Sequence, residues 1–555
     1  MSRFLTSVAC WYAAGALMAL GLGYAGLIAA GSVGAFAPYF GALALGLVAA
    51  FLFAREPGVG ARWRLPLIAL AVVPAMAWVS MQVSFGMIDM HAVLYHVRHG
   101  KGGIGMSHPI AVFNVVFSAS VLAMLAAFTV AMSRRPVLVR WDRRLWLPLL
   151  VVNPFTFAIV EATGVLSDGD RNRLAKAYVV PAPRAPSNDL LVPAATGSAR
   201  VRPSLIHIYL ESAERAFAEP AFQGAMDPIM ALEPQAFTAT NMGQVSQTDW
   251  SMAGIVASQC GVPLIQPFLQ SRNPSNADAD FMTGAHCLGD VLAGDNYSIS
   301  FVRAGDMDFA GNRQFHLSHG YDTIIGAAEI AKAEPRATTN DWGVDDEWLF
   351  AAARRRLDTL ADERKRTGRP FYLSIEPLGA HPPDGFVTRA CEDLSPPLKA
   401  RIGMLRSLEC VNRLTIDLLE RARGLGQLEN TIVVIQSDHL AMRNTVSAEL
   451  AKHPRRNLFL VMGDGVAPGV SHRPSTMMDV YPTILAALGY ALPDGRAGLG
   501  TDLRADRPTL SERWKWKDMS DAIVTDRHLK RHLWGEPGQL PRAEPRESED
   551  IAAAR

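Results

Sequence analysis

The hydrophobic positions of this chain change their pattern near residue 167. Before that point the apolar runs are long, and each approaches the length needed to cross the ~30 Å hydrocarbon core of a bilayer. Basic residues concentrate in alternate connections between the runs, so the positive-inside rule places the chain after the last run outside the cytoplasm. We therefore predict an α-helical membrane domain over residues 1–166, with about five spans at 4–30, 36–53, 65–84, 110–132 and 145–166.

After residue 167 the apolar runs become short. Residues 167–200 are rich in Pro, Ala and Ser, which predicts a juxtamembrane helix and a linker. Over 201–507, runs rich in β-branched residues alternate with helical patterns, which predicts an α/β domain with a mostly parallel sheet flanked by helices. The tail at 508–555 mixes aromatic and basic residues, and we favour a surface helix there over a segment lying on the bilayer. The predicted strands are SLIHIYL, YSISFV, FYLSIEP, TIVVIQS and NLFLVMG.

The cysteines agree with an exported domain. All but one of the 5 cysteines lie after residue 200. An even set in such a domain favours disulfides, and no Cys-x-x-Cys spacing points to a metal. Of the three pairings that four cysteines allow, we favour the one between nearest neighbours, because it closes short local loops. It joins Cys260 to Cys287 and Cys391 to Cys410.

Charge gives little information about partners. The formal net charge is +1, and no dense Lys/Arg tract indicates a nucleic-acid partner. Partners are therefore expected in the membrane and in the exported compartment. In the first exported loop, His91, His96 and His99 lie close enough to suggest a metal, but we favour an interfacial helix because Asp89 is the one acidic residue beside them.

Two predicted strands end in side chains that bind metals. The run TIVVIQS leads directly to Asp438 and His439, and SLIHIYL leads to Glu211. The carboxyl ends of parallel strands meet at one edge of a sheet, where ligands of such folds usually bind. Carboxylate and imidazole suit a borderline divalent cation such as Zn²⁺ or Mn²⁺. The alternative for an isolated Asp-His pair is a polar strand end facing solvent, and the matching Glu211 favours the metal site.

Thr248 is the candidate nucleophile. It lies at the start of an apolar helical pattern, TDWSMAGIVASQ. A cation that coordinates its hydroxyl would favour the alkoxide near neutral pH. The alternative role is that of a helix N-cap, for which Thr is a preferred residue. Ser246 and Ser251 are neighbouring hydroxyls that compete for the same assignment.

Several motifs follow one another between residues 201 and 490: IYLESAERAF, SQTDWSMAGIVASQCGVPL, CLGDVL, FAGNRQFHLSHGYD, NDWG, HPPDGF and SDHLAMRN. Together they resemble the phosphoglycerol transferase I family of osmoregulated periplasmic glucans, and more distantly the lipoteichoic acid synthases. Both belong to the alkaline phosphatase and sulfatase superfamily, so the resemblance implies an alkaline-phosphatase/sulfatase-like domain. Cys260 is not part of the Cys-x-Pro-x-Arg signature of formylglycine sulfatases, which disfavours a sulfatase.

The resemblance also implies a site and a reaction. One divalent ion, Mn²⁺ with Mg²⁺ or Zn²⁺ as alternatives, is bound by Glu211, Thr248, Asp438 and His439. Thr248 forms a covalent intermediate while phosphoglycerol passes from phosphatidylglycerol to a periplasmic glucan, with release of diacylglycerol. The enzyme would lie in a bacterial inner membrane, with its catalytic domain in the periplasm. Four further residues match positions near the substrate or lining the site: Arg313 and His381, then His472 and Arg473.

Two other functions remain open on the sequence alone. A phosphoethanolamine transferase acting on lipid A or a glycan uses a similar membrane plan and a metal-bound Thr. A non-catalytic envelope sensor or binding protein on the same fold is less expected. A site that has lost its activity usually loses at least one of its metal-site residues, and all four are present here. His319, in HLSHGYD, is predicted to be structural, since the run is typical of a helix that ends at a Gly C-cap.

Overall fold

The computed structural model describes residues 173–179, 192–193, 200–265 and 281–535. The chain divides into two units: residues 1–166 with 382–384 and 442–454, and the remainder of 167–555. The five predicted spans and the His91, His96 and His99 loop lie outside the described residues. Among the described helices, none combines the length and the apolar character that a membrane span requires.

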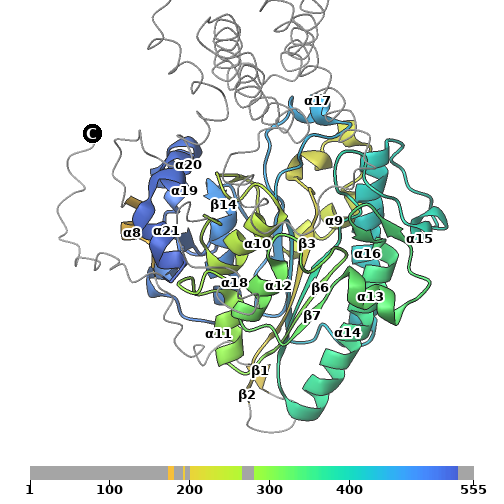
Figure 1. The fold of residues 1–555 in the computed structure, drawn as a ribbon, viewed down its shortest axis with the longest axis horizontal. Helices are drawn as coiled ribbons and strands as arrows, with labels where there is room; N and C mark the ends of the chain where they lie inside the picture. The colour runs from red at the N-terminus through yellow and green to blue at the C-terminus, as the bar shows by residue number, and fades with distance from the viewer. Residues whose placement is uncertain (1–172, 180–191, 194–199, 266–280, 536–555) are drawn as a thin grey trace, which may run out of the picture. The chain divides into compact units, whose positions relative to one another are not determined.

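The second unit is built on an eight-stranded, mostly parallel sheet (Figure 1). Its order is β13-β4-β12-β11-β3-β10-β6-β7, and β12 runs antiparallel to both of its neighbours. The runs predicted from sequence form β3, β6, β10, β11 and β12. The strands are β3 Ser204–Leu210, β4 Phe237–Ala239, β6 Ser298–Arg303, β7 Thr323–Ile325, β10 Phe371–Glu376, β11 Thr431–Ser437, β12 Phe459–Met462 and β13 Gly469–Ser471.

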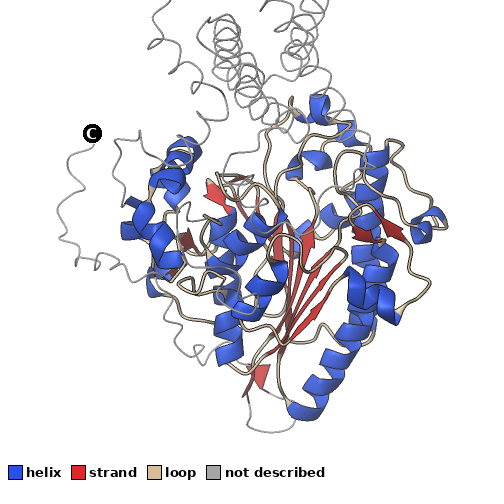
Figure 2. Ribbon diagram, in the orientation of Figure 1, coloured by secondary structure: helices blue, strands red, loops and turns tan. Residues whose placement is uncertain are grey.

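Helices cover both faces of this sheet (Figure 2). On one side lie α14 (Asp346–Thr367) and α16 (Gly403–Gly424), and on the other α10 (Ser251–Cys260), α11 (Leu288–Gly294) and α18 (Val480–Ala487). With both faces covered, β3 and β11 are buried along their whole length, so they appear in the sequence as continuous apolar runs. The predicted α/β layers are confirmed.

Shorter elements connect these layers. Small two-stranded pairs are formed by β1 with β2, β5 with β14, β8 with β9 and β15 with β16. Their bounds are β1 Val192–Pro193, β2 Arg200–Val201, β5 Met242–Gly243, β8 Thr339–Asn340, β9 Gly343–Val344, β14 Ser475–Thr476, β15 Arg496–Ala497 and β16 Gly500–Thr501. The short helices are α9 Asp227–Met230, α12 Asn312–Ser318, α13 Ala327–Ala333, α15 Arg389–Glu392 and, in the first unit, α17 Ser447–Leu450.

The C-terminal segment is folded against the start of the second unit. It forms α19 (Leu510–Arg513), α20 (Trp516–Thr525) and α21 (Arg527–Leu533), which gather beside α8 (Arg173–Ala177) in Figure 1. One carboxylate joins the two ends: Asp526 Oδ1 accepts from the N–H groups of His528 and Leu529, and Oδ2 accepts from those of Leu174 and Ala175. Asp526 therefore caps two helices far apart in sequence.

Both predicted disulfides are present. Cys260 is bonded to Cys287 and Cys391 to Cys410, with Cα atoms 4.0 and 5.7 Å apart. The first joins the end of α10 to the residue before α11, and the second ties α15 to α16. Disulfides of this kind are typical of domains outside the cytoplasm.

Candidate metal centre

Three predicted ligands converge at the carboxyl end of the sheet. The parallel register pairs Ser437 of β11 with Leu210 of β3, so the next residues, Asp438 and Glu211, emerge side by side. His439 Nε2 lies 3.2 Å from Asp438 Oδ2 and 3.5 Å from Glu211 Oε1. One ligand atom from each residue lies within 4.8 Å of the other two, and all three side chains are buried. The structure therefore brings together three of the four residues predicted as metal ligands.

The hydrogen bonds around this group direct its remaining lone pairs inward. Asp438 Oδ1 accepts from the backbone N–H groups of Ser212 and His439, each at 2.8 Å. His439 Nδ1 lies 2.8 Å from the Leu440 carbonyl, which can only accept, so Nδ1 carries a proton and Nε2 is the nitrogen that offers a lone pair to a cation once the ring is neutral. Within the described residues, Asp438 Oδ2 and His439 Nε2 have no hydrogen-bond partner. Buried acceptors without donors fit a bound cation.

The electrostatics of the group also favour a cation. Burial and the nearby Glu211 carboxylate raise the pKa of Asp438 to about 7. For His439, burial opposes the charged ring, but the carboxylates of Asp438 and Glu211 outweigh it and raise the pKa. The two carboxylates are held close together away from solvent, so they repel each other or take up a proton unless a positive charge lies between them. The donor set of two carboxylates and one imidazole fits a divalent ion.

Helix α10 is packed directly against this centre. A Cβ atom on Gly254 would lie 1.7 Å from the Asp438 carbonyl oxygen, so only glycine permits this approach. The approach brings the first turn of α10 to the ligands, where Ser251 Oγ donates to Glu211 Oε2 at 3.2 Å. The other oxygen, Oε1, accepts from Ser212 Oγ at 2.7 Å. Both oxygens of Glu211 are thus oriented by hydroxyl groups.

Thr248 is fully buried in the turn that leads into α10. Its hydroxyl donates to the Val245 carbonyl at 2.8 Å, within its own turn. The helix begins at Ser251, and Trp250 occupies the cap position in extended backbone. Thr248 is therefore not the N-cap, which was its alternative role from sequence. Of the three hydroxyls considered from sequence, the one that hydrogen-bonds to Glu211 belongs to Ser251, one of the two competing serines.

Arg313 and His381 have well-defined neighbours. Arg313 Nε donates to Asp308 Oδ1 at 2.6 Å, its Nη2 lies 3.5 Å from Glu329, and a third of the side chain is exposed. The His381 ring stacks on Trp342, with centroids 3.7 Å apart. No role was predicted for the NDWG run, and the structure places its Trp against a predicted substrate residue.

His472 and Arg473 make contacts of a structural kind. His472 is exposed, and its Nδ1 lies 2.7 Å from Thr240 Oγ1. Arg473 donates to the carbonyl of Ala505, which precedes α19, at 2.6 Å. It also pairs at 3.1 Å with Glu512, which lies in α19. The Arg473 contacts therefore join the segment between β13 and β14 to the C-terminal segment.

Two charged residues at this edge were missed from sequence. Glu376 ends β10 and Arg303 ends β6, and the parallel register pairs them directly. Both side chains are buried, with Arg303 Nε 3.2 Å from Glu376 Oε2. The signal was available, because a charged residue closing an apolar strand is the same pattern that revealed Glu211.

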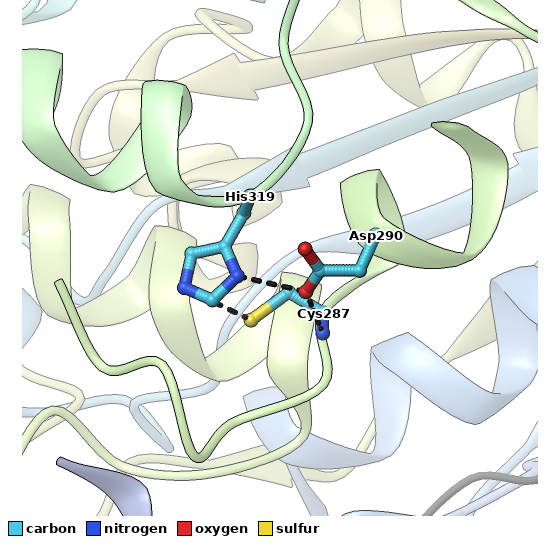
Figure 3. A group of neighbouring side chains, drawn as sticks. All are labelled: Cys287, Asp290 and His319. Carbon is cyan, nitrogen blue, oxygen red and sulfur yellow. Dashed lines mark hydrogen bonds and ion pairs between the residues drawn. The ribbon is translucent and has the colours of Figure 1, made fainter. Parts of the chain in front are cut away.

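A second group of metal-ligand types lies beside α11. Figure 3 shows Cys287, Asp290 and His319, with His319 Nδ1 2.8 Å from Asp290 Oδ2 and Nε2 3.8 Å from Cys287 Sγ. Because Cys287 is bonded to Cys260, it offers no thiolate to a metal. His319 follows the last residue of α12, and Gly320 has a φ of 80°. The predicted structural role of His319 at a helix end agrees with this geometry.

Comparisons with known proteins connect this centre to a family. Residues 252–490 match the Sulfatase family. Phosphoglycerol transferase I of Xanthomonas axonopodis pv. citri is 31% identical over 455 residues, which cover 79% of this chain and 62% of the relative. The chain is therefore similar to phosphoglycerol transferase I over most of its own length. The phosphoglycerol transferase I of Citrobacter koseri is 33% identical over 302 residues, 54% of this chain and 38% of that protein. The chain thus spans less than two thirds of the length of these phosphoglycerol transferases.

Solved structures to which this chain is similar include the lipoteichoic acid synthase LtaP of Listeria monocytogenes. Its TM-score is 0.44 at 13% identity, over 66% of this chain and 96% of that one. A protein of the alkaline phosphatase superfamily from Vibrio parahaemolyticus has a TM-score of 0.43 at 17% identity, over 63% and 81% of the two chains. The family match and the mostly parallel sheet together indicate a sulfatase-like α/β domain.

Proposed function

We propose that this chain transfers phosphoglycerol from phosphatidylglycerol to a periplasmic glucan, using a divalent ion held by Glu211, Asp438 and His439. The observation that carries the proposal is the buried convergence of these three side chains, with the inward atoms of Asp438 and His439 lacking donors. The relationship to phosphoglycerol transferase I supports the choice of donor and acceptor. Mn²⁺ is the proposed ion, with Mg²⁺ and Zn²⁺ as alternatives.

The nucleophile in this proposal is Thr248. Its Oγ1 forms a bond to phosphorus while the bond from phosphorus to the diacylglycerol oxygen breaks. A divalent ion at the centre would stabilise the alkoxide and the charge on the phosphoryl oxygens. Thr248 must first give up its hydrogen bond to the Val245 carbonyl, so a small rearrangement of this turn precedes the chemistry.

Proton transfer is assigned to His381. The Thr248 proton passes to solvent as the hydroxyl attacks, and His381, protonated at the start, gives its proton to the oxygen of the departing diacylglycerol. In the second half-reaction a glucan hydroxyl attacks the phosphorus and its proton passes to His381, while the bond to Thr248 breaks and Thr248 Oγ1 takes up a proton from solvent. Arg313 is the proposed partner of the phosphate, which requires it to exchange its contact with Asp308 for the substrate.

The surrounding residues orient these groups. Ser212 and Ser251 fix the two oxygens of Glu211, and Gly254 holds α10 against Asp438. A membrane domain at 1–166 would keep the centre near the lipid headgroup that it uses, which raises the effective concentration of the donor. The proposed location is a bacterial inner membrane, with the second unit in the periplasm.

Two lipids with different headgroup labels test the proposal. The detergent-solubilised full chain is given Mn²⁺, a periplasmic glucan, and phosphatidylglycerol and phosphatidylethanolamine together. We expect the glycerol label alone to enter the glucan, with one diacylglycerol released per transfer. Thr248→Ala and His439→Ala should abolish transfer in folded protein. Ethanolamine label in the glucan would overturn the proposal in favour of phosphoethanolamine transfer.

A further inference from the structure

A row of polar side chains crosses the sheet just below the metal centre. The register pairs Tyr209 with Gln436 and Glu376 with Arg303, and Ile208 with Ile375, which places Tyr209 level with Glu376. Paired residues in a sheet point to the same face, and residues two apart on a strand share that face. Glu376 and Arg303 therefore lie on the face that carries Glu211 and Asp438.

The Arg303–Glu376 pair is incompletely satisfied. The two side chains are 4% and 0% exposed, yet their closest approach of 3.2 Å lacks hydrogen-bond geometry. Within the described residues, both oxygens of Glu376 and the Nε and Nη1 atoms of Arg303 have no hydrogen-bond partner. Burying a carboxylate without donors is costly, so such a group in a native site points to a ligand that supplies them.

The charges of the metal centre act on Glu376. Burial raises the pKa of Glu376 to about 7, the Arg303 guanidinium opposes this, and Asp438 and His439 contribute in opposite directions. The register gives the same proximity, because Glu376 is level with Tyr209 on the adjacent strand and Glu211 follows Tyr209 by two residues on the same face. It is outside the group whose ligand atoms lie within 4.8 Å of one another, so its oxygens do not reach the position shared by Glu211, Asp438 and His439.

We propose that Glu376 is a further residue of the metal centre, an outer carboxylate that accepts hydrogen bonds from water on the ion and is held in place by Arg303. This rests on the divalent ion of the proposed function. The bound water supplies the donors that Glu376 lacks, and the added carboxylate balances the positive charge of the ion. Arg303 is a positioning residue. The absence of a side chain at Gly305 leaves room for it, because a Cβ there would lie 2.9 Å from Arg303 Nη2.

Manganese binding to the full chain in detergent tests this role without turnover. Mn²⁺ alone is titrated in, and free and bound ion are followed by electron paramagnetic resonance. Outer carboxylates of this kind contribute about ten- to one-hundredfold to metal affinity. We expect Glu376→Gln and Glu376→Asp each to weaken Mn²⁺ binding about tenfold or more, and to change the spectrum of the bound ion. Glu376→Asp keeps the charge but shortens the reach by one methylene.

A matched control lies elsewhere in the same unit. Glu409 is 1% exposed and pairs with Arg413 at 2.6 Å within α16, so Glu409→Gln breaks a buried Glu–Arg pair outside the centre. This variant should bind Mn²⁺ like the unchanged protein. Unfolding curves recorded without metal identify variants that fail to fold, and titrations are made well below each midpoint.

The outcomes separate this inference from the function on which it rests. If His439→Ala abolishes Mn²⁺ binding while both Glu376 variants bind normally, the role of Glu376 is wrong and the centre stands. If Glu376→Asp binds Mn²⁺ normally while Glu376→Gln binds it weakly, the negative charge alone accounts for the effect. That result would overturn the proposal that the position of the Glu376 carboxylate matters. If the unchanged protein binds no divalent ion, both proposals fall.

Discussion

The indole ring of Trp342 stacks on the imidazole of His381, with ring centroids 3.7 Å apart and planes inclined by 25°. The loop that carries Trp342 is fixed at several points. Asn340 Oδ1 accepts from the Trp342 backbone N–H, and Asn340 Nδ2 donates to Asp345. Asp346 then accepts from the backbone of Leu378 and Gly379, on the segment that leads to His381. These hydrogen bonds therefore fix the loop that carries Trp342 and the segment that leads to His381.

The first prediction concerns this stack. Aromatic pairs contribute about 1 kcal/mol, which corresponds to roughly fivefold in rate. Trp342→Leu should lower kcat for phosphoglycerol transfer about fivefold and shift its pH profile, because His381 loses its fixed orientation. Trp342→Phe keeps a ring and should recover most of the rate. In a His381→Gln background Trp342→Leu should have no further effect. Equal losses in both backgrounds would show that Trp342 acts independently of His381.

The second prediction concerns the packing of α10 on the centre. Gly254→Ala places a methyl group 1.7 Å from the Asp438 carbonyl oxygen, so the helix must move. Overpacking of this kind costs about 1–3 kcal/mol. We expect a lower unfolding midpoint and weaker Mn²⁺ binding. The control is Gly294→Ala in α11, where nothing lies within 4 Å of the added Cβ. Similar behaviour of the two variants would contradict the close contact.

The third prediction is a pH dependence of metal binding. In the metal-free protein the pKa of Asp438 is about 7 and that of His439 is raised, so protons occupy the ligands near neutral pH. Metal binding must release them, and affinity must rise as pH rises. Between about pH 6 and pH 8 Asp438 alone should contribute roughly tenfold. Calorimetry in two buffers of different ionisation enthalpy counts the released protons. Affinity that stays constant over this range would refute the prediction.

The fourth prediction concerns the double cap. Asp526 accepts four backbone N–H groups from α21 and α8. Losing one helix cap costs about 0.5–2 kcal/mol, so Asp526→Ala should destabilise the second unit by at least about 1 kcal/mol. Limited proteolysis should also release the C-terminal segment sooner. Asp521→Ala on the same segment removes an exposed carboxylate paired with Lys517 and should change stability little. Equal sensitivity of both variants would rule out a special role for Asp526.

The sequence predicted the features that depend on local pattern. Buried strands give continuous apolar runs, so the five central segments and the ligands at their ends were visible without coordinates. The disulfides followed from the parity and spacing of the cysteines. The start of α10 was misjudged, because the polar residues before Ser251 are equally compatible with a helix and with the turn that they form.

Other features depend on tertiary register and loop paths. The pairing of Arg303 with Glu376 requires β6 to lie next to β10, and adjacency in a sheet is not encoded in either run. The stack of Trp342 on His381 joins two loops whose courses depend on side-chain hydrogen bonds. The cluster of Cys287, Asp290 and His319 resembles a metal site by residue type, and the disulfide gives it a structural role (Figure 3).

The most direct measurement is the mass of the protein after reaction with donor lipid alone. The full chain is incubated with Mn²⁺ and phosphatidylglycerol, without a glucan, and examined by intact mass and peptide mapping. We expect one phosphoglycerol group on Thr248, an equal amount of released diacylglycerol, and loss of the adduct when glucan is added. Folded, metal-loaded protein that releases diacylglycerol without an adduct, or carries the adduct on Ser251, would contradict the assignment of Thr248 as nucleophile.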